Sequence, residues 1–305
     1  ARAAVVHASL CALAVPGRAW RARGRTPSGV AMEGRVAALA VWRADRVRDG
    51  AARRDGGLAG GLRDGVHGTG MVRGDLVDAV CRVLKQVGDA DRASGQQAYM
   101  KSAMPFRGIR APHLKAALKP LLADPTYRLL SRDEWEATVR RLWDGAQFRE
   151  ERYAALAISG HRLYRSWAQD RSAMPLYLYL VETGGWWDFV DEIAARRVGP
   201  VLRAHPETEA ERMRSWAIAD NMWVRRAAIL SQLSSKAETD LPLLLDCITP
   251  NLTDAEFFIR KAIGWSLRQY AHSSSEAADW VRRTVEQLGP QLSPLSRREA
   301  LKNLV

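Results

Sequence analysis

The chain has 305 residues, with 46 lysines and arginines against 34 aspartates and glutamates, for a formal net charge of +12 at pH 7. Its hydrophobic fraction of 47% is enough for a sizeable core, in one large domain or two ordinary ones. Three isolated cysteines imply a reducing compartment and exclude a disulfide framework, six scattered histidines argue against a metal site, and no apolar run is long enough to span a membrane.

The first seventy residues differ in composition from the rest of the chain. They contain twelve arginines, no lysine, five acids and about half of the glycines. This segment lacks a sustained hydrophobic period, so we expect it to be disordered. Met71 opens the first stretch of ordinary composition. We therefore interpret residues 1–70 as a non-native leader and residues 71–305 as the domain. The alternative is a targeting peptide, because an apolar run at residues 3–15 precedes Pro16-Gly17-Arg18.

From Met71 onward, hydrophobic residues recur at helical spacing and no alternating strand pattern is convincing. A capping box at Ser131-Arg-Asp-Glu134 predicts the start of a helix through Trp135 and Leu142. The other predicted helices are 75–87, 149–158, 176–182, 186–197, 209–218, 224–233, 241–248, 256–270 and 277–288.

A weak internal repeat organises these helices. Residues 223–229 and 258–264 align 35 positions apart, and residues 153–156 lie about two such periods upstream. Small residues at one position of each repeat allow neighbouring helices to approach closely. The pattern predicts an all-α fold, an α-solenoid of HEAT-like helical repeats whose concave face would bind a long partner.

Basic residues recur at or near equivalent places in this repeat, namely Arg225, Arg226, Arg260, Lys261 and Arg268. Cations repeated along a solenoid suit a phosphate backbone, and the neighbouring tryptophans could contact sugars or bases. The plainer interpretation is a solvated helix face.

Several short motifs occur together in one order along the chain. They are Tyr99-Met100-Lys101 with Pro105-Phe106-Arg107-Gly108-Ile109, Trp187-Asp188-Phe189-Val190-Asp191, Trp223-Val224-Arg225-Arg226 and Lys261-Ala262-Ile263-Gly264-Trp265. In this order they resemble the AlkD-type alkylpurine DNA glycosylases, HEAT-like repeat proteins of the DNA alkylation repair family. The resemblance runs from about residue 75 to the end of the sequence. The leader has no counterpart in the family pattern.

The resemblance implies a role for each matching residue. Asp191 would be the catalytic carboxylate, Trp187 and Trp265 aromatic walls beside the target nucleotide, and Arg226 the cation near the phosphates. Tyr99 would border the same cleft.

Further DNA contacts are expected from Lys101, Arg225, Arg260 and Lys261. We interpret Trp223 as a core residue and Asp188 as a surface carboxylate near a helix start.

The resemblance also implies a monofunctional glycosylase of the 3-methyladenine/7-methylguanine type. It would need no cofactor or metal, act as a monomer on double-stranded DNA containing alkylated purines, and work in the bacterial cytoplasm in association with the nucleoid.

The chemistry of such a reaction explains why one carboxylate would suffice. An N3- or N7-alkylated purine already carries positive charge and can leave without a protonating acid, unlike an ordinary glycoside. The sugar that remains resembles an oxocarbenium ion, which a carboxylate stabilises while it also orients water. Whether the base is flipped stays open. The alternative function is a non-catalytic HEAT-like module that binds nucleic acid or a protein partner. A strand-nicking lyase is disfavoured because it needs an amine nucleophile.

Overall fold

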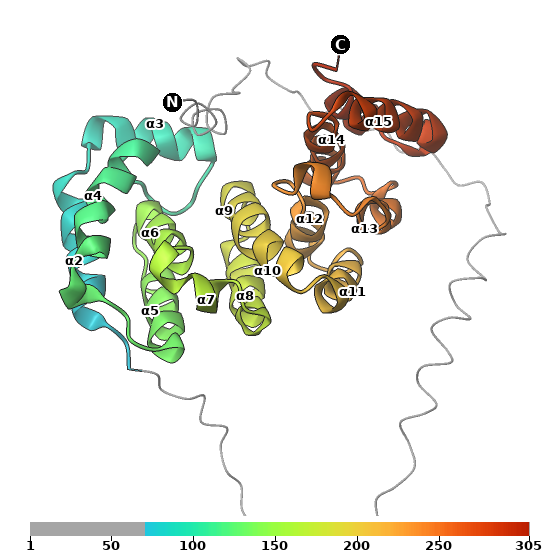
Figure 1. Ribbon diagram of the computed structural model, residues 1–305. Coiled ribbons are helices and arrows are strands. Elements are labelled where there is room, and N and C mark those ends of the chain that lie inside the picture. The colour runs from blue at the N-terminus through green and yellow to red at the C-terminus, as the bar shows by residue number, and fades with distance from the viewer. Residues whose placement is uncertain (1–70, 305) are drawn as a thin grey trace, which may run out of the picture. The chain divides into compact units, whose positions relative to one another are not determined.

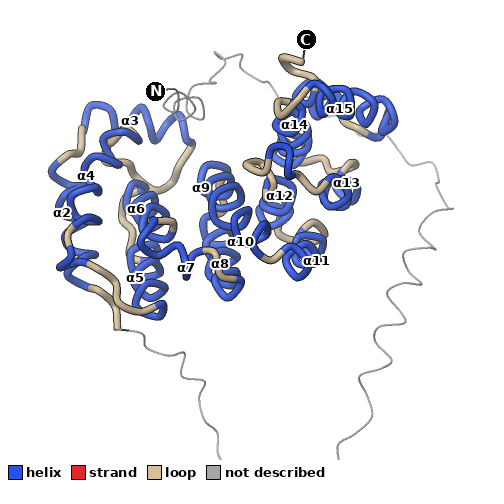
Figure 2. Tube along the Cα trace, in the orientation of Figure 1, coloured by secondary structure: helices blue, strands red, loops and turns tan. Residues whose placement is uncertain are grey.

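The computed structural model describes residues 71–304, which belong to one compact unit. This part of the chain consists of helices and connecting loops without a strand, which confirms the all-α prediction (Figures 1 and 2). The expectations about the leader, its disorder, its possible targeting role and the start at Met71 concern residues 1–70, which lie outside the described residues.

The α-helices follow one another through the whole described part. Their bounds are α2 Gly74–Gln86, α3 Ala90–Met100, α4 Ala111–Ala123, α5 Arg132–Asp144, α6 Arg149–Ser159, α7 Arg165–Ala168, α8 Met174–Gly184, α9 Trp187–Ile193, α10 Gly199–Ala204, α11 Pro206–Trp216, α12 Met222–Leu230, α13 Leu241–Ile248, α14 Phe257–Ala271, α15 Ser275–Leu288 and α16 Pro294–Ala300. A π-helical turn, Ala194–Val198, joins α9 to α10.

Every helix predicted from the hydrophobic period is present. The Ser131 hydroxyl accepts from the Glu134 N–H (3.1 Å), so the predicted N-cap is confirmed, but the Glu134 carboxylate accepts from the N–H of Leu130. Helices α3, α4, α7, α10 and α16 were not predicted from the sequence. Helix α3 buries only Met100, and α4 carries Pro112 near its start and Pro120 inside it. Neither therefore shows a clean apolar period bounded by capping residues.

The helices form two rows. Helices α4, α6, α9, α12 and α14 lie along the inner side of the curve in Figure 1, with α2, α5, α8, α11 and α13 behind them. Contacts run between successive inner helices, as in α9 with α12 and α12 with α14, and α14 packs against α16 at the C-terminal end. Helices α4, α6, α9 and α12 also pack on α2, α5, α8 and α11 respectively, and α14 packs on α15. This arrangement is an α-solenoid, in which each pair of helices shares its core with the next pair.

Small residues allow the close helix contacts, as the repeat predicts. Ala227 and Ala228 of α12 are buried, as are Ala262 and Gly264 of α14. A Cβ atom at Gly264 would lie 2.5 Å from the Ser296 carbonyl oxygen and 2.5 Å from the Cβ of Glu299, both in α16. Glycine is therefore required where α14 meets α16.

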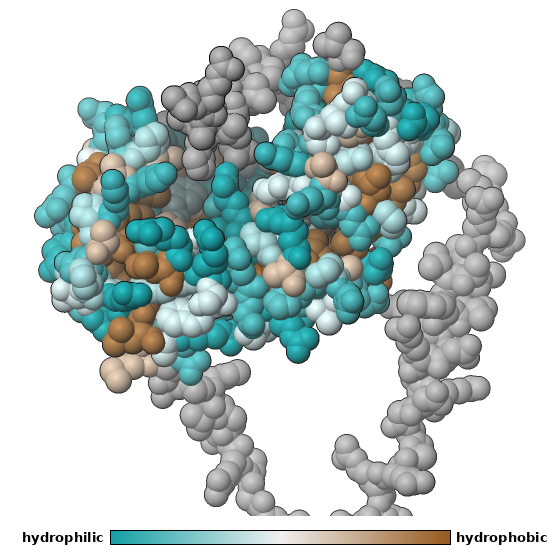
Figure 3. All heavy atoms as spheres, viewed as in Figure 1, coloured by the Kyte–Doolittle hydropathy of each residue, from teal (hydrophilic) through white to brown (hydrophobic). Residues whose placement is uncertain are grey.

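Hydrophilic residues cover much of the face visible in Figure 3, with hydrophobic patches between them. The exposed large hydrophobic residues of the described part are Met71, Val72, Val87, Tyr99, Leu130, Leu163, Ile218 and Phe257. Two of these, Tyr99 and Phe257, are aromatic.

We expect Gly264→Ala to lower the free energy of unfolding by about 1–3 kcal/mol, because the added methyl group overpacks the contact between α14 and α16. Gly95→Ala is the matched control, since Gly95 lies in α3 and a methyl group added there would have no atom of a neighbouring residue within 4 Å. That substitution should be neutral or stabilising by about 0.5–1 kcal/mol. Denaturant titration of the full chain measures both, and equal effects would contradict the packing argument.

Candidate active site

Three helices of the inner row begin side by side. Trp186, at the start of α9, lies 6.0 Å from Trp223 of α12 and 5.6 Å from Phe258 of α14, measured between ring centroids. Trp223 and Phe258 are themselves 5.1 Å apart. Because the three rings sit within the first residues of their helices, α9, α12 and α14 run in the same direction with their first turns together. This aromatic cluster fixes the register of the three helices.

A buried ion pair lies just beyond the aromatic cluster. Arg226 of α12 donates from Nε to Asp191 Oδ1 at 2.7 Å and from Nη2 to Asp191 Oδ2 at 2.9 Å. Its third nitrogen, Nη1, donates to the backbone carbonyl of Phe258 in α14. The side chain of Arg226 is 4% exposed and that of Asp191 13%. One guanidinium thus connects three successive inner helices.

Burial and ion pairing act against each other at this carboxylate. Burial raises the pKa of Asp191, and the nearby negative charge of Asp188 raises it further, while the charge and hydrogen bonds of Arg226 lower it. The net direction is upward because removal from water disfavours the charged form strongly. Arg226 is therefore the group that opposes this rise and favours the ionised form of Asp191.

The next carboxylate on α9, Asp188, anchors the start of the helix. It accepts from Arg149 Nη2 at 2.5 Å and from the Tyr153 hydroxyl at 2.6 Å, both in α6. The interpretation of Asp188 as a surface carboxylate is wrong: its side chain is 13% exposed and paired with an arginine that is 6% exposed. Asp188 and Arg149 hold α9 against α6, which sets the position of Trp187 and Asp191.

The two tryptophans expected beside the target nucleotide are both half-buried. Trp187 lies one helical turn before Asp191 on the same face of α9. It contacts no aromatic ring of the described residues, unlike its neighbour Trp186. Trp265 packs against the core from α14, two turns beyond Phe258 on the same side of that helix. No hydrogen bond or ring contact within residues 71–304 joins Trp265 to Asp191 or Trp187.

Three of the basic residues expected at the phosphates have carboxylate partners. Besides Arg226, Arg225 pairs with Asp254 at 2.8 Å and also donates to the carbonyls of Ala219 and Asp220. Lys261 pairs with Glu299 at 2.7 Å. These contacts place their positive charges beside acids of the protein itself.

The other residues expected to contact DNA have no acidic partner among the described residues. Arg260 is half-buried and forms no ion pair with a described residue. Tyr99 is 58% exposed and Lys101 is exposed at the end of α3.

Phe257 is an aromatic residue that the sequence analysis did not single out. It is 52% exposed and contacts Phe258 at 5.4 Å, which extends the aromatic cluster to the surface. The signal in the sequence was the Phe257-Phe258 pair directly before the repeat, but a hydrophobic residue at a helix start does not by itself indicate exposure. Trp223 packs against the core, in agreement with its interpretation as a core residue.

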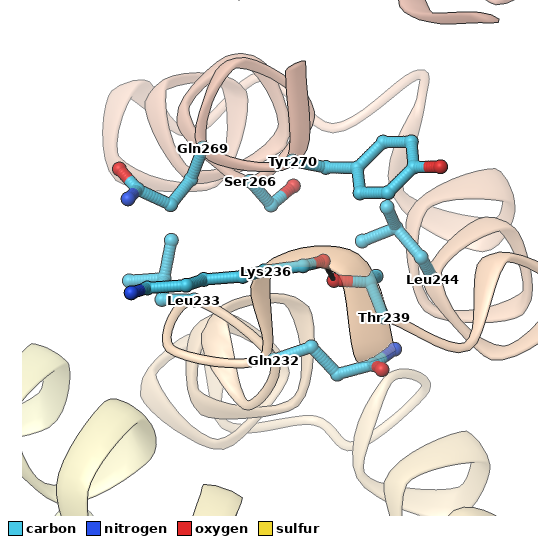
Figure 4. A pocket seen from close by; sticks show the side chains of 8 residues that line it. All are labelled: Gln232, Leu233, Lys236, Thr239, Leu244, Ser266, Gln269 and Tyr270. Atoms are coloured by element: carbon cyan, nitrogen blue, oxygen red, sulfur yellow. Dashed lines mark hydrogen bonds between the residues drawn. The ribbon is translucent and has the colours of Figure 1, made fainter. Parts of the chain in front are cut away.

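A small cavity elsewhere in the inner row is too small for a nucleotide. It lies between the loop after α12 and the last turns of α14, lined by residues that include Gln232, Lys236, Ser266 and Tyr270 (Figure 4). Its volume of about 10 Å³ has room for one water molecule.

Residues 71–304 contain no group of three or more histidine, cysteine or acidic side chains placed to hold a metal ion. No helix in this part is both long and apolar enough to cross a membrane.

Comparison with known proteins agrees with the geometry. The family model for the DNA alkylation repair enzyme matches residues 80–304. A solved structure of a predicted DNA alkylation repair enzyme from Enterococcus faecalis is similar to this chain with 31% sequence identity and a TM-score of 0.61, covering 72% of this chain and 97% of that one. No curated protein matches the chain significantly. The ordered motifs, the solenoid and these matches agree, and the chain belongs to the DNA alkylation repair enzyme family.

Proposed function

We propose that the protein is a monofunctional DNA glycosylase that hydrolyses the N-glycosidic bond of N3- or N7-alkylated purines in duplex DNA. The observation that carries this proposal is the buried Asp191 carboxylate, held by Arg226 on the inner row one helical turn from the half-buried Trp187. Cleavage of the N-glycosidic bond makes the sugar transiently positive, and a negative charge placed against it stabilises that state. We further infer that it acts as a monomer in the cytoplasm.

The reaction requires only water as a co-reactant. The bond between C1′ and the purine nitrogen breaks, its electron pair leaves with the alkylated purine, and that electron pair neutralises the charge of the base. Water then adds to C1′ and loses a proton, so the strand keeps an abasic site. The carboxylate of Asp191 stabilises the transient positive charge on the sugar and orients the water.

The bidentate pair with Arg226 is compatible with this role. An ionised carboxylate offers about four lone-pair positions, and the two N–H groups of Arg226 occupy one on each oxygen. Each oxygen therefore keeps one free position for the sugar or a water. Arg226 then serves to orient Asp191 and to keep it charged. This role differs from the phosphate contact implied by the resemblance, because the guanidinium is 4% exposed.

Trp187 supplies the aromatic surface beside this charge. The face of an indole ring attracts cations, and its bulk excludes water, so the attraction between Asp191 and the sugar is screened less. Trp265 is proposed to serve as the opposite wall from α14. Phe257 offers further exposed aromatic surface at the helix starts.

We expect Asp191→Asn to slow the release of 7-methylguanine from a methylated duplex at least hundredfold, a barrier increase of about 3 kcal/mol, because the neutral amide cannot stabilise the sugar cation. The measurement is a single-turnover assay with the full chain in excess over DNA. Circular dichroism must show that the variant is folded at the assay temperature, since a buried Arg226 without its partner costs about 3–5 kcal/mol.

Asp188→Asn is the matched control for this experiment. Both aspartates lie on α9, are 13% exposed and pair with a buried arginine, so the two substitutions remove the same charge in similar surroundings. The control should lose stability but keep base release within about tenfold. Equal losses in both variants would assign the effect to the placement of α9 and not to the charge of Asp191, and DNA binding without any release by the parent would favour the non-catalytic module.

The acid side of the pH–rate profile tests the pairing of Asp191 with Arg226. Base release requires the ionised carboxylate, so the rate falls as pH drops through the pKa of Asp191. Arg226→Gln removes the group that lowers this pKa, and the acid limb should move to higher pH. A carboxyl group whose pKa is raised by folding stabilises the fold at low pH and loses that contribution as pH rises through the raised pKa. The variant should therefore also unfold more easily as pH rises, and an unshifted profile would contradict this role of Arg226.

A further inference from the structure

One segment of the described chain is basic without any compensating acid. Residues 101–123, here named the basic arm, include five lysines and arginines and no aspartate or glutamate. Arg107 is used internally, since it pairs with Glu151 at 2.7 Å. The other four are exposed and form no ion pair with a described residue; they are Lys101, Arg110, Lys115 and Lys119.

The cations of the inner helices around Asp191 differ from those of the basic arm because they have carboxylate partners. Arg226, Arg225 and Lys261 each have a carboxylate within 2.8 Å. A cation already paired with an acid contributes little to binding a polyanion, because DNA must compete with the internal partner. The basic arm, by contrast, presents four exposed cations in a segment without an acid, at the N-terminal end of the inner row.

The basic arm is held in a defined position by α6. The Glu150 carboxylate accepts from the backbone N–H groups of Arg107 (2.9 Å) and Ile109 (3.0 Å). The Arg149 N–H donates to the carbonyl of Pro105 (2.9 Å). Gly108 adopts φ +82°, where a Cβ atom would clash with the backbone of Asp89. These contacts give the loop a fixed course rather than leaving it free.

The same helix joins the basic arm to the candidate active site. Arg149 of α6 reaches Asp188 on α9, three residues before Asp191. Helix α4 packs on α6 in the inner row. With neighbouring helix axes about 8–10 Å apart, α4 lies roughly 20 Å from α9, the length of about six nucleotides of a duplex strand.

The backbone conformation of Lys101 is unusual for a residue that carries a side chain. Lys101 follows α3 in the left-handed conformation, with φ 50°, where glycine or asparagine is usual. A residue with a side chain pays about 1–2 kcal/mol for this conformation. The conformation ends α3 and leaves the lysine exposed beside Tyr99.

We propose that Lys101, Arg110, Lys115 and Lys119 bind the phosphate backbone of duplex DNA about half a helical turn from the alkylated nucleotide. This inference rests on the proposed function only for the choice of DNA as partner. The arm supplies sequence-independent affinity, while the residues around Asp191 act on the lesion. Binding by such cations releases counterions from DNA, and the dependence of affinity on salt reports their number.

The test replaces the four arm residues by glutamine together and measures binding of an undamaged duplex over a range of KCl concentrations. Each lost phosphate contact should reduce the slope of log K against log salt by about 0.9, so we expect a reduction of about 2–4 and at least tenfold weaker binding at about 0.1 M salt. The matched control neutralises four exposed cations of α2, α5 and α15, namely Arg82, Lys85, Arg141 and Arg283, with the same change in net charge. Its slope should equal that of the parent.

Base release separates this inference from the proposed function. At enzyme concentrations that saturate the DNA, the arm variant should release 7-methylguanine within threefold of the parent rate, because the arm does not touch the reacting nucleotide. Equal slopes for the arm and control variants would overturn the role of the arm. A loss of rate above tenfold at saturation would overturn its placement away from the lesion. A parent that releases no base would refute the glycosylase, while the salt slopes would still decide the arm.

Discussion

The structure around the candidate site depends on the buried ion pair between Asp191 and Arg226. A buried pair gives up the hydration of both charges, and it persists only where the geometry is good and the remaining N–H groups find partners. The carboxylate is bound through both oxygens, and the third guanidinium nitrogen bonds to the Phe258 carbonyl, so each nitrogen of Arg226 has a partner. Because those groups come from α9, α12 and α14, the stacking of the solenoid and the charge state of the carboxylate depend on the same contacts.

Ion pairs and hydrogen bonds of charged side chains also join other neighbouring helices of the inner row. Asp188 joins α9 to α6 through Arg149 and Tyr153, and Glu299 joins α16 to α14 through Lys261 and Arg268 at 2.7–2.8 Å. Tyr153 is buried against Asp188, and burial raises the pKa of its hydroxyl, so it stays a neutral donor. Each of these interfaces therefore contains at least one charged side chain shielded from water. Such contacts fix the relative positions of helices more narrowly than apolar packing alone, because their geometry is directional.

The distribution of charge follows from this use of arginine and lysine. In the sequence, the cations of the repeat suited either a phosphate backbone or a plain solvated helix face. In the structure, most of them pair with the protein's own acids, whereas residues 101–123 present four exposed cations without a carboxylate partner among the described residues. A basic residue in a helix has the same appearance in a sequence whether its partner is a phosphate or an aspartate 29 or 35 positions away. Only the packing of helices distinguishes the two.

The sequence by itself determined the all-α class, the helices with clear apolar periods, the close contacts at alanine and glycine, and the family, because these depend on local spacing and on ordered motifs. It also singled out Trp187, Asp191, Arg226 and Trp265, whose catalytic roles stay predictions. The tertiary structure decided that Asp188 is buried against Arg149, that Arg226 holds Asp191, and that Phe257 is exposed. It also revealed α4, which packs on α2 and α6, and α3, which donates hydrogen bonds from Arg92 and Gln96 to backbone carbonyls of the following loop. Ion pairs and exposure depend on residues distant in the chain, and local periodicity carries no information about which distant residue becomes the neighbour.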